Sequence, residues 1–179
     1  VIDFSFSPEV EAVRMKVRSF MDEVVRPEWD AIDQGNREQL VKTIVALRKK
    51  AKEWNLWLPH MPAEWGGMGL GPTAMAAVSA EAAKVSIGPF VLNAQAPDEG
   101  NQHTLLHWAT PMQKEKYLKP LCEGTARSCF AMTEPEVAGS DPTLIKTFAY
   151  KDGDEWVING HKWFISGARG AQFALLVAR

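Results

Sequence analysis

Apolar residues at helical spacing dominate the first part of the chain. Ser7-Pro8 suits a helix N-cap followed by proline at the first helical position, and the apolar residues behind it repeat every three or four positions. The pattern predicts a first amphipathic helix that ends near Arg26-Pro27. Its apolar set is Val10, Val13, Val17, Phe20, Met21 and Val24.

A second helix is predicted over residues 37–54. Lys and Arg gather toward its C-terminal end, where the helix dipole favours cations. The stretch 57–72 is crowded with Pro and Gly but also carries aromatic and apolar residues, which indicates an ordered, packed loop. The apolar set of the second helix is Leu40, Ile44, Leu47 and Ala51.

The next segments complete a predicted helical domain. Residues 73–85 are rich in Ala, a composition that suits a helix packed closely against its neighbours. Two further short helices are predicted over 101–109 and 112–121, broken at Pro111. Residues 1–125 are therefore interpreted as an N-terminal all-α bundle.

After Arg127 the hydrophobic pattern changes its period. Short β-prone runs are separated by turn signals, and Asp152-Gly153 and Asn159-Gly160 both favour two-residue hairpin turns. We therefore expect an antiparallel meander over 143–166, and residues 126–179 form the first part of a β-domain. The predicted strands are 128–132, 144–150, 155–158, 161–165 and 172–178.

Composition argues against several function classes. The formal net charge of −2 gives no electrostatic reason to expect nucleic acid or an anionic membrane as a partner. No apolar stretch approaches the roughly 20 residues that span a bilayer, and Val1–Phe4 lacks a basic region followed by an apolar one, so a cytoplasmic location is the default. Cys122 and Cys129 make neither a disulfide framework nor a metal spacing, and no metal site is predicted.

The segment 130–141 carries the strongest chemical signal. A short apolar strand ends at Thr133, whose hydroxyl can donate and accept a hydrogen bond, and Gly139 allows backbone N–H groups to approach an anionic group. This suits a diphosphate-bearing cofactor. In the later run, Phe164 and Ser166 would offer a ring and a hydroxyl on one side of a strand, as a flat heterocycle requires.

Four segments together resemble the acyl-CoA dehydrogenases, and the resemblance covers essentially all 179 residues. It implies an α+β fold: the helical bundle, then the beginning of an antiparallel β-barrel domain, with a C-terminal helical domain missing from this chain. A loop longer than the common form, Glu134–Ser140, resembles the branch of larger mammalian members fused to kinase-like domains. The segments are Phe-Ser-Pro-Glu, Pro-Ala-Glu-Trp-Gly-Gly-Met-Gly-Leu, Phe-Ala-Met-Thr-Glu-Pro and Ile-Asn-Gly-His-Lys-Trp-Phe-Ile-Ser.

The resemblance also implies site residues. Phe130, Met132 and Thr133 would lie against the flavin ring, with the Thr133 hydroxyl on its pyrimidine edge. Ser140 would contact the cofactor diphosphate or the acyl-CoA substrate. Phe164, Ile165 and Ser166 would line the other side, with Ser166 near the flavin N5. The cofactor-binding residues implied are Phe130, Met132, Thr133, Gly139, Ser140, Phe164, Ile165 and Ser166.

The implied activity is α,β-dehydrogenation of acyl-CoA thioesters to enoyl-CoA with hydride transfer to N5 of FAD, a reaction of fatty acid β-oxidation. The catalytic base of the family is a Glu of the C-terminal domain, and no residue of this chain matches it; Glu134 and Asp141 are interpreted as loop-shaping residues. Implied partners are electron-transfer flavoprotein as electron acceptor and further copies of the chain in a homodimer or homotetramer. In a eukaryote the location would be the mitochondrial or peroxisomal matrix.

Two other interpretations stay open. A flavin oxidase or monooxygenase of the same fold would keep the cofactor and change the chemistry, and its reduced flavin would react rapidly with oxygen. A non-catalytic helical interaction module would keep the flavin residues only as remnants. It predicts no flavin in the full-length protein.

Overall fold

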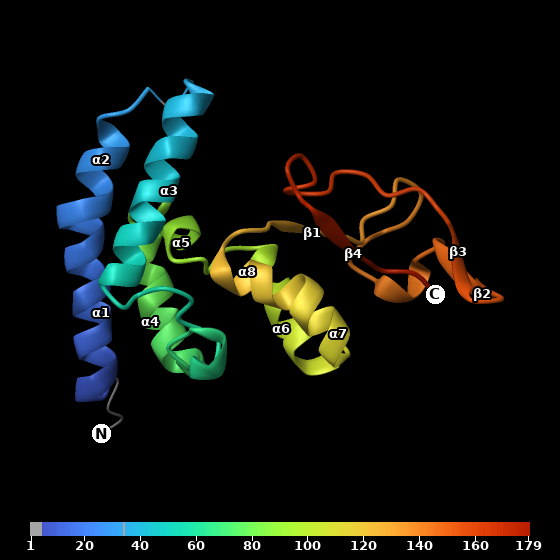
Figure 1. Cartoon of the computed structure of the whole chain (residues 1–179), viewed down its shortest axis with the longest axis horizontal. Coiled ribbons are helices and arrows are strands. Elements are labelled where there is room, and N and C mark those ends of the chain that lie inside the picture. Colours follow the sequence, from blue (N-terminus) through green and yellow to red (C-terminus); the bar gives the residue numbers. More distant parts are fainter. Residues whose placement is uncertain (1–4, 34) are drawn as a thin grey trace. The chain divides into compact units, whose positions relative to one another are not determined.

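The computed structural model describes residues 5–33 and 35–179 (Figure 1). The start Val1–Phe4, on which the expectation of no leader segment rests, lies outside the described residues. Two compact units divide the chain, Val1–Glu99 and Gly100–Arg179. The predicted domain boundary between residues 125 and 126 is a separate matter and stays a prediction.

The first helix continues beyond its predicted end. α1 (Pro8–Phe20) runs into a π-helical turn, Met21–Val25, and then into α2 (Arg26–Asp30). The Arg26 N–H bonds to the Met21 carbonyl, five residues back. Because the ring of Pro27 would clash with the carbonyl four residues back in a regular α-helix, this wider turn lets the helix pass the proline.

The same device recurs in the second unit, where a π-helical turn, Lys114–Leu118, precedes α8 (Lys119–Glu123). There the Lys119 N–H bonds to the Lys114 carbonyl, directly before Pro120. A proline placed just after such a turn therefore does not end a helix in this protein.

The first unit packs α1 against the Ala-rich α4. α3 (Arg37–Glu53), α4 (Pro72–Ala82) and α5 (Gly88–Val91) complete its α-helices among the described residues, and a 3-10 turn, Ala63–Trp65, lies in the loop. The small side chains of α4 let the two helix backbones approach closely. The largest fully buried side chains of this unit are Phe20, Met21, Leu47, Leu56, Leu58, Met61, Leu92, Val17 and Val25.

The Pro- and Gly-rich stretch 57–72 is an ordered loop, as predicted. The Leu58 N–H bonds to the Leu92 carbonyl at 2.9 Å, and Leu58 and Met61 are completely buried. A Cβ on Gly67 would lie 2.0 Å from the Met61 carbonyl oxygen, so only glycine fits where the loop folds back on itself.

The second unit begins its α-helices with α6 (Asp98–Trp108) and α7 (Pro111–Gln113), followed by the π-helical turn and α8. Its strands are β1 (Ser128–Ala131), β2 (Phe148–Asp152), β3 (Glu155–Asn159) and β4 (Phe173–Leu176), with a 3-10 turn at Pro142–Leu144. β1 pairs with β4 in parallel, with Ser128 opposite Phe173. β2 and β3 form an antiparallel hairpin with Asp152 opposite Glu155, which confirms a two-residue hairpin turn here but places it at Gly153 and Asp154, one position later than the predicted Asp152-Gly153.

The predicted meander is wrong beyond β3. Residues 161–165 form no strand, and Asn159-Gly160 is not a hairpin turn. The chain instead turns toward the end of β1, where the Trp163 N–H bonds to the Thr133 carbonyl at 3.1 Å. Gly160 lies against Thr147, because a Cβ there would come within 2.1 Å of the Thr147 hydroxyl oxygen.

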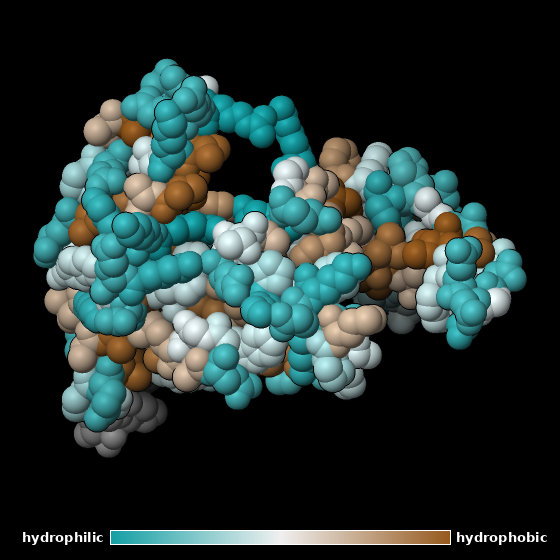
Figure 2. All heavy atoms as spheres, in the orientation of Figure 1, coloured by the Kyte–Doolittle hydropathy of each residue, from teal (hydrophilic) through white to brown (hydrophobic). Residues whose placement is uncertain are grey.

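The β2–β3 hairpin exposes apolar side chains on both of its faces. Hydrophobic atoms reach the visible surface among hydrophilic ones in Figure 2. Phe148 and Tyr150 stack along one face with ring centroids 6.3 Å apart. Trp156 and Ile158 project from the other face, with 65% and 51% of their surface exposed.

Candidate functional site

Two segments distant in sequence are joined at the end of β1. The Trp163 N–H bonds to the Thr133 carbonyl at 3.1 Å, and the Lys162 ammonium donates to the Met132 carbonyl at 2.8 Å. These contacts place residues 132–133 beside residues 162–163. They therefore bring together the two segments that carry the predicted flavin contacts.

The Glu134 carboxylate joins this junction to a third segment, residues 146–147. Its carboxylate accepts hydrogen bonds from the Lys162 ammonium at 2.8 Å, the Lys146 N–H at 2.7 Å and the Thr147 N–H at 2.8 Å. The side chains of Glu134 and Lys162 are only 3% and 9% exposed. The Lys162 ammonium, followed by the contacts with Thr147 and Lys146, holds the pKa of Glu134 far below its usual range.

The loop after Glu134 folds back toward Thr133. A Cβ on Gly139 would lie 3.9 Å from Cγ2 of Thr133, an ordinary contact distance, and would meet no other atom within 4 Å, so the loop passes close to this residue. Asp141 then caps the Pro142–Leu144 turn, its Oδ1 accepting from the Thr143 N–H at 3.0 Å and from the Thr143 hydroxyl at 2.6 Å. The Thr143 contacts also lower the pKa of Asp141. Glu134 and Asp141 thus shape the loop, as the sequence indicated.

Exposed rings surround the junction. The rings of Trp163 and Phe164 lie 4.6 Å apart, tilted by 37°, and Phe164 is 81% exposed. Phe164 adopts a left-handed backbone conformation with φ of +49°, which is rare for a bulky side chain and typical of constrained functional segments. On β1, Phe130 also exposes 40% of its surface.

The structure brings only some of the predicted site residues together. Met132, Thr133 and Gly139 lie together with the start of the later segment. Ile165 opens a turn closed by the Ala168 N–H at 3.2 Å, and Ser140 and Ser166 are exposed. Because 161–165 is not a strand, the predicted placement of Phe164 and Ser166 on one strand face is wrong.

Lys162 is the residue that the sequence analysis missed. A lysine is mostly exposed in proteins and so by itself gives no sign in the sequence of a buried contact. A carboxylate beside Thr133 and a lysine beside Trp163 were the available signals. Their pairing depends on the chain leaving β3 toward β1, which the hairpin propensity of Asn159-Gly160 contradicted.

The described residues hold no evident metal site and no membrane-spanning helix. Among residues 5–33 and 35–179, no group of three or more His, Cys, Asp and Glu side chains could hold a metal ion. The helices in these same ranges are too short or too polar to cross a membrane.

Cys122 and Cys129 are both buried, and burial raises the pKa of Cys122 to about 12. A pocket of about 280 Å³ adjoins the junction, because Glu134 forms part of its wall. Its lining residues are Glu134, Pro135, Glu136, Lys146, Thr147, Phe148, Asn159, Gly160 and His161.

Comparison with known protein families defines the class. Residues 7–125 match the N-terminal domain of acyl-CoA dehydrogenases, and residues 129–179 match their middle domain. The chain belongs to the acyl-CoA dehydrogenase family. The predicted resemblance and fold class are both confirmed: a helical N-terminal domain is followed by the start of the β middle domain.

Individual relatives agree with this assignment. Acyl-CoA dehydrogenase family member 11 of Gallus gallus is 38% identical over 176 residues, which cover 92% of this chain and 22% of that protein. This match agrees with the branch that the longer loop indicated. A putative acyl-CoA dehydrogenase from Mycobacterium abscessus superposes with a TM-score of 0.82 at 33% identity, over 92% of this chain and 44% of that one. An acyl-CoA dehydrogenase from Bacillus anthracis, solved in complex with FAD, gives a TM-score of 0.71 at 25% identity over 100% of this chain and 30% of that one.

The chain therefore spans 22–44% of the length of these relatives. Family membership rests on both matched domains. The individual cofactor contacts stay predictions.

Proposed function

We propose that this protein is a flavoprotein that oxidises acyl-CoA thioesters to enoyl-CoA with FAD as the hydride acceptor. The observation that carries the proposal is the junction of residues 132–133 with 162–163, because it gathers the hydroxyl-bearing and aromatic segments expected to hold a flavin. Membership of the acyl-CoA dehydrogenase family supports the same conclusion.

The chemistry of these residues fits FAD. A flat heterocycle requires ring surface and hydrogen-bonding groups at its edge, and the exposed Phe164 and Phe130 rings and the Thr133 hydroxyl provide both. An anionic diphosphate requires an approach without repulsion. The carboxylate that follows Thr133 in the chain, that of Glu134, is buried and paired with Lys162, and the Glu136 carboxylate of the same loop is paired with Lys146, so both are compensated by cations.

The bound flavin would supply the redox chemistry, as the acceptor of the hydride from the β-carbon of the acyl group. The work of this chain is to bind and orient. We propose that the Thr133 hydroxyl fixes the flavin edge, that Gly139 and Ser140 hold the diphosphate or the acyl-CoA, and that Phe164, Ile165 and Ser166 line the ring.

Removal of the α-proton requires a carboxylate base, and we assign none in this chain. Glu134 is engaged by three donors and has a strongly lowered pKa, so it is a poor proton acceptor. Asp141 is engaged by Thr143. We propose that the base is a Glu of a C-terminal domain, as the family resemblance implies. We also propose electron-transfer flavoprotein as the electron acceptor and a homodimeric or homotetrameric assembly.

The test is an anaerobic absorbance spectrum of the protein at its natural length, recorded before and after each of a panel of acyl-CoA thioesters. Flavin absorbance that bleaches with at least one thioester, and that returns slowly on admission of oxygen, is expected. Flavin that bleaches with no thioester, or that reoxidises rapidly in air, would favour an oxidase or monooxygenase. Protein purified without flavin and unable to bind added FAD would contradict a catalytic role.

A further inference from the structure

The buried Lys162–Glu134 pair is a strongly charged element of the described junction to which the proposed function gives no part in holding the flavin. Its members lie beside the predicted flavin contacts, but neither is exposed enough to bind a ligand directly. We propose that this pair positions the two flavin-binding segments and tunes the electrostatic environment of the flavin. The inference rests on the proposed function.

The positioning role follows from the number of contacts that meet at this pair. The Lys162 ammonium reaches both the Met132 carbonyl and Glu134, each at 2.8 Å. Glu134 in turn accepts from two consecutive backbone N–H groups, those of Lys146 and Thr147. Three stretches of chain, 132–134, 146–147 and 162–163, are thereby held at one point, and the backbone bond from the Trp163 N–H to the Thr133 carbonyl also joins the first and last of them.

Lys162 therefore sets where its neighbours lie. The contact between Lys162 and the Met132 carbonyl fixes the position of Met132 itself. It also restrains Thr133, the next residue on one segment, and Phe164, two residues after Lys162 on the other. Loss of the ammonium would leave the Met132 carbonyl without this donor and the buried carboxylate with two backbone N–H donors but no compensating cation, a state that buried charge strongly disfavours. The segments would then separate or rearrange, and the flavin surface would lose its fixed geometry.

The electrostatic role follows from opposite charges in a poorly solvated place. In the intact pair each charge compensates the other. Removing only the carboxylate leaves a positive charge that favours reduced flavin, which is more negative than the oxidised form, and removing only the ammonium leaves a negative charge that opposes reduction. The two substitutions should therefore shift the flavin reduction potential in opposite directions, which a purely structural role would not do.

The experiment uses the protein at its natural length and FAD itself as the probe. Lys162→Met, Lys162→Arg and Glu134→Gln are compared with wild type for FAD affinity by flavin fluorescence and for reduction potential by dye equilibration. Matched controls are Lys119→Met and Glu115→Gln, which break an exposed ion pair of the same unit by the same chemical changes.

We expect Lys162→Met and Glu134→Gln each to weaken FAD binding about tenfold or more, with the potential lower in the first and higher in the second. Lys162→Arg should restore most of the affinity, and the controls should match wild type. Glu134→Gln keeps the shape of the side chain, so it tests the pair even if Lys162→Met does not fold.

The failures are distinguishable. A wild-type protein that binds no FAD would overturn the proposed function and this inference with it. A wild-type protein that binds FAD, with folded variants that bind it equally well, would overturn the inference alone. Potentials that move in the same direction in both variants would overturn the electrostatic role.

Discussion

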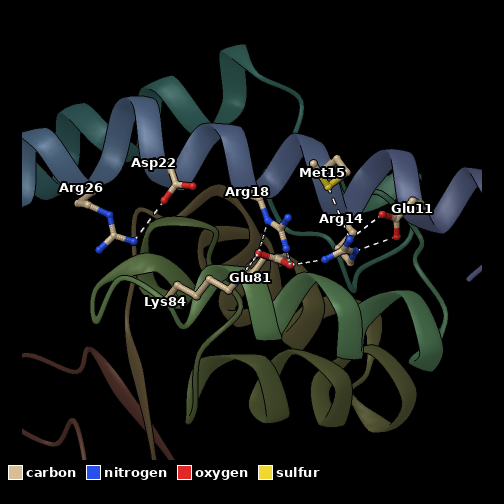
Figure 3. A network of polar contacts seen from close by, with 8 residues as sticks. All are labelled: Glu11, Arg14, Met15, Arg18, Asp22, Arg26, Glu81 and Lys84. Atoms are coloured by element: carbon tan, nitrogen blue, oxygen red, sulfur yellow. Dashed lines mark hydrogen bonds and ion pairs between the residues drawn. The ribbon is translucent and has the colours of Figure 1, made fainter. Parts of the chain in front are cut away.

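Arg18 on α1 donates two hydrogen bonds to Glu81 on α4, at 2.8 and 3.1 Å (Figure 3). Arg14 adds a third contact to the same carboxylate at 2.6 Å, and Lys84 a fourth at 2.5 Å. The Glu81 side chain is only 4% exposed. One buried carboxylate thus collects three cations and joins the first helix to the Ala-rich helix that packs on it.

Glu81→Gln should destabilise the protein. The substitution keeps the shape of the side chain but removes the charge that three cations share, so Arg14 keeps only Glu11 as a carboxylate partner while Arg18 and Lys84 lose their contact with Glu81. We expect the melting temperature to fall by roughly 5 °C. Glu53→Gln is the matched control, because Glu53 makes only a long, exposed contact of 4.0 Å with Lys49. Equal melting temperatures in the two variants would contradict the role of Glu81.

The same carboxylate predicts a pH dependence. Hydrogen bonds from Arg18, and then from Lys84 and Arg14, lower the pKa of Glu81 to about 2, from an ordinary value of 4.5. Because the folded-state pKa is the lower one, the stability that Glu81 contributes is complete above about pH 4.5 and is lost as pH falls toward 2. Thermal melts at pH 7 and pH 2.5 should therefore show a difference between wild type and Glu81→Gln that shrinks in acid. A difference that stays constant over this range would contradict the assignment.

The helical elements were largely predictable from local pattern. Ser7-Pro8 accurately marked the start of α1, where the Ser7 hydroxyl accepts from the Val10 N–H at 3.4 Å, and the Ala-rich composition located α4. The end of the first helix was predicted too early. Pro27 is a strong signal for a helix end, and nothing local indicates that a π-helical turn will accommodate it.

The site was predictable in composition but not in geometry. The segments around Thr133 and Phe164 stood out by residue type, whereas their junction depends on a long-range bond from Trp163 to Thr133. Local hairpin propensity at Asn159-Gly160 favoured the wrong path. The buried hydrogen bonds of Lys162 and the close approach of Gly160 to Thr147 favour the observed path of the chain. Both are contacts between residues distant in sequence, so a local hydrophobic pattern does not predict them.

Gly160→Ala should disturb the site through sterics alone. A Cβ at this position would lie 2.1 Å from the Thr147 hydroxyl oxygen and 2.6 Å from the Thr147 Cβ, so the chain that leads to Lys162 must move. We expect a loss of about 1–3 kcal/mol in the free energy of unfolding together with weaker FAD binding. Urea unfolding and flavin fluorescence would measure the two effects.

Gly100→Ala is the control for that substitution. Gly100 lies inside α6, where a Cβ meets no atom within 4 Å and alanine is the better helix former. We expect this variant to be as stable as wild type or more stable by about 0.5–1 kcal/mol. A Gly160→Ala protein that unfolds at the same urea concentration as Gly100→Ala would show that the loop adjusts without cost.

Thr133→Ala tests the predicted flavin contact most directly. The substitution removes one exposed hydroxyl and leaves the Thr133 carbonyl, which holds the Trp163 N–H, in place. Loss of one hydrogen bond of about 0.5–1.5 kcal/mol should weaken FAD binding by about 2- to 12-fold while the melting temperature of the flavin-free protein stays unchanged. Thr104→Ala removes a hydroxyl that bonds within its own helix, to the Gly100 carbonyl at 2.9 Å, and should leave FAD affinity as it is. Equal FAD affinity in Thr133→Ala and wild type would place the flavin edge away from Thr133 and require a different orientation of the ring at this junction.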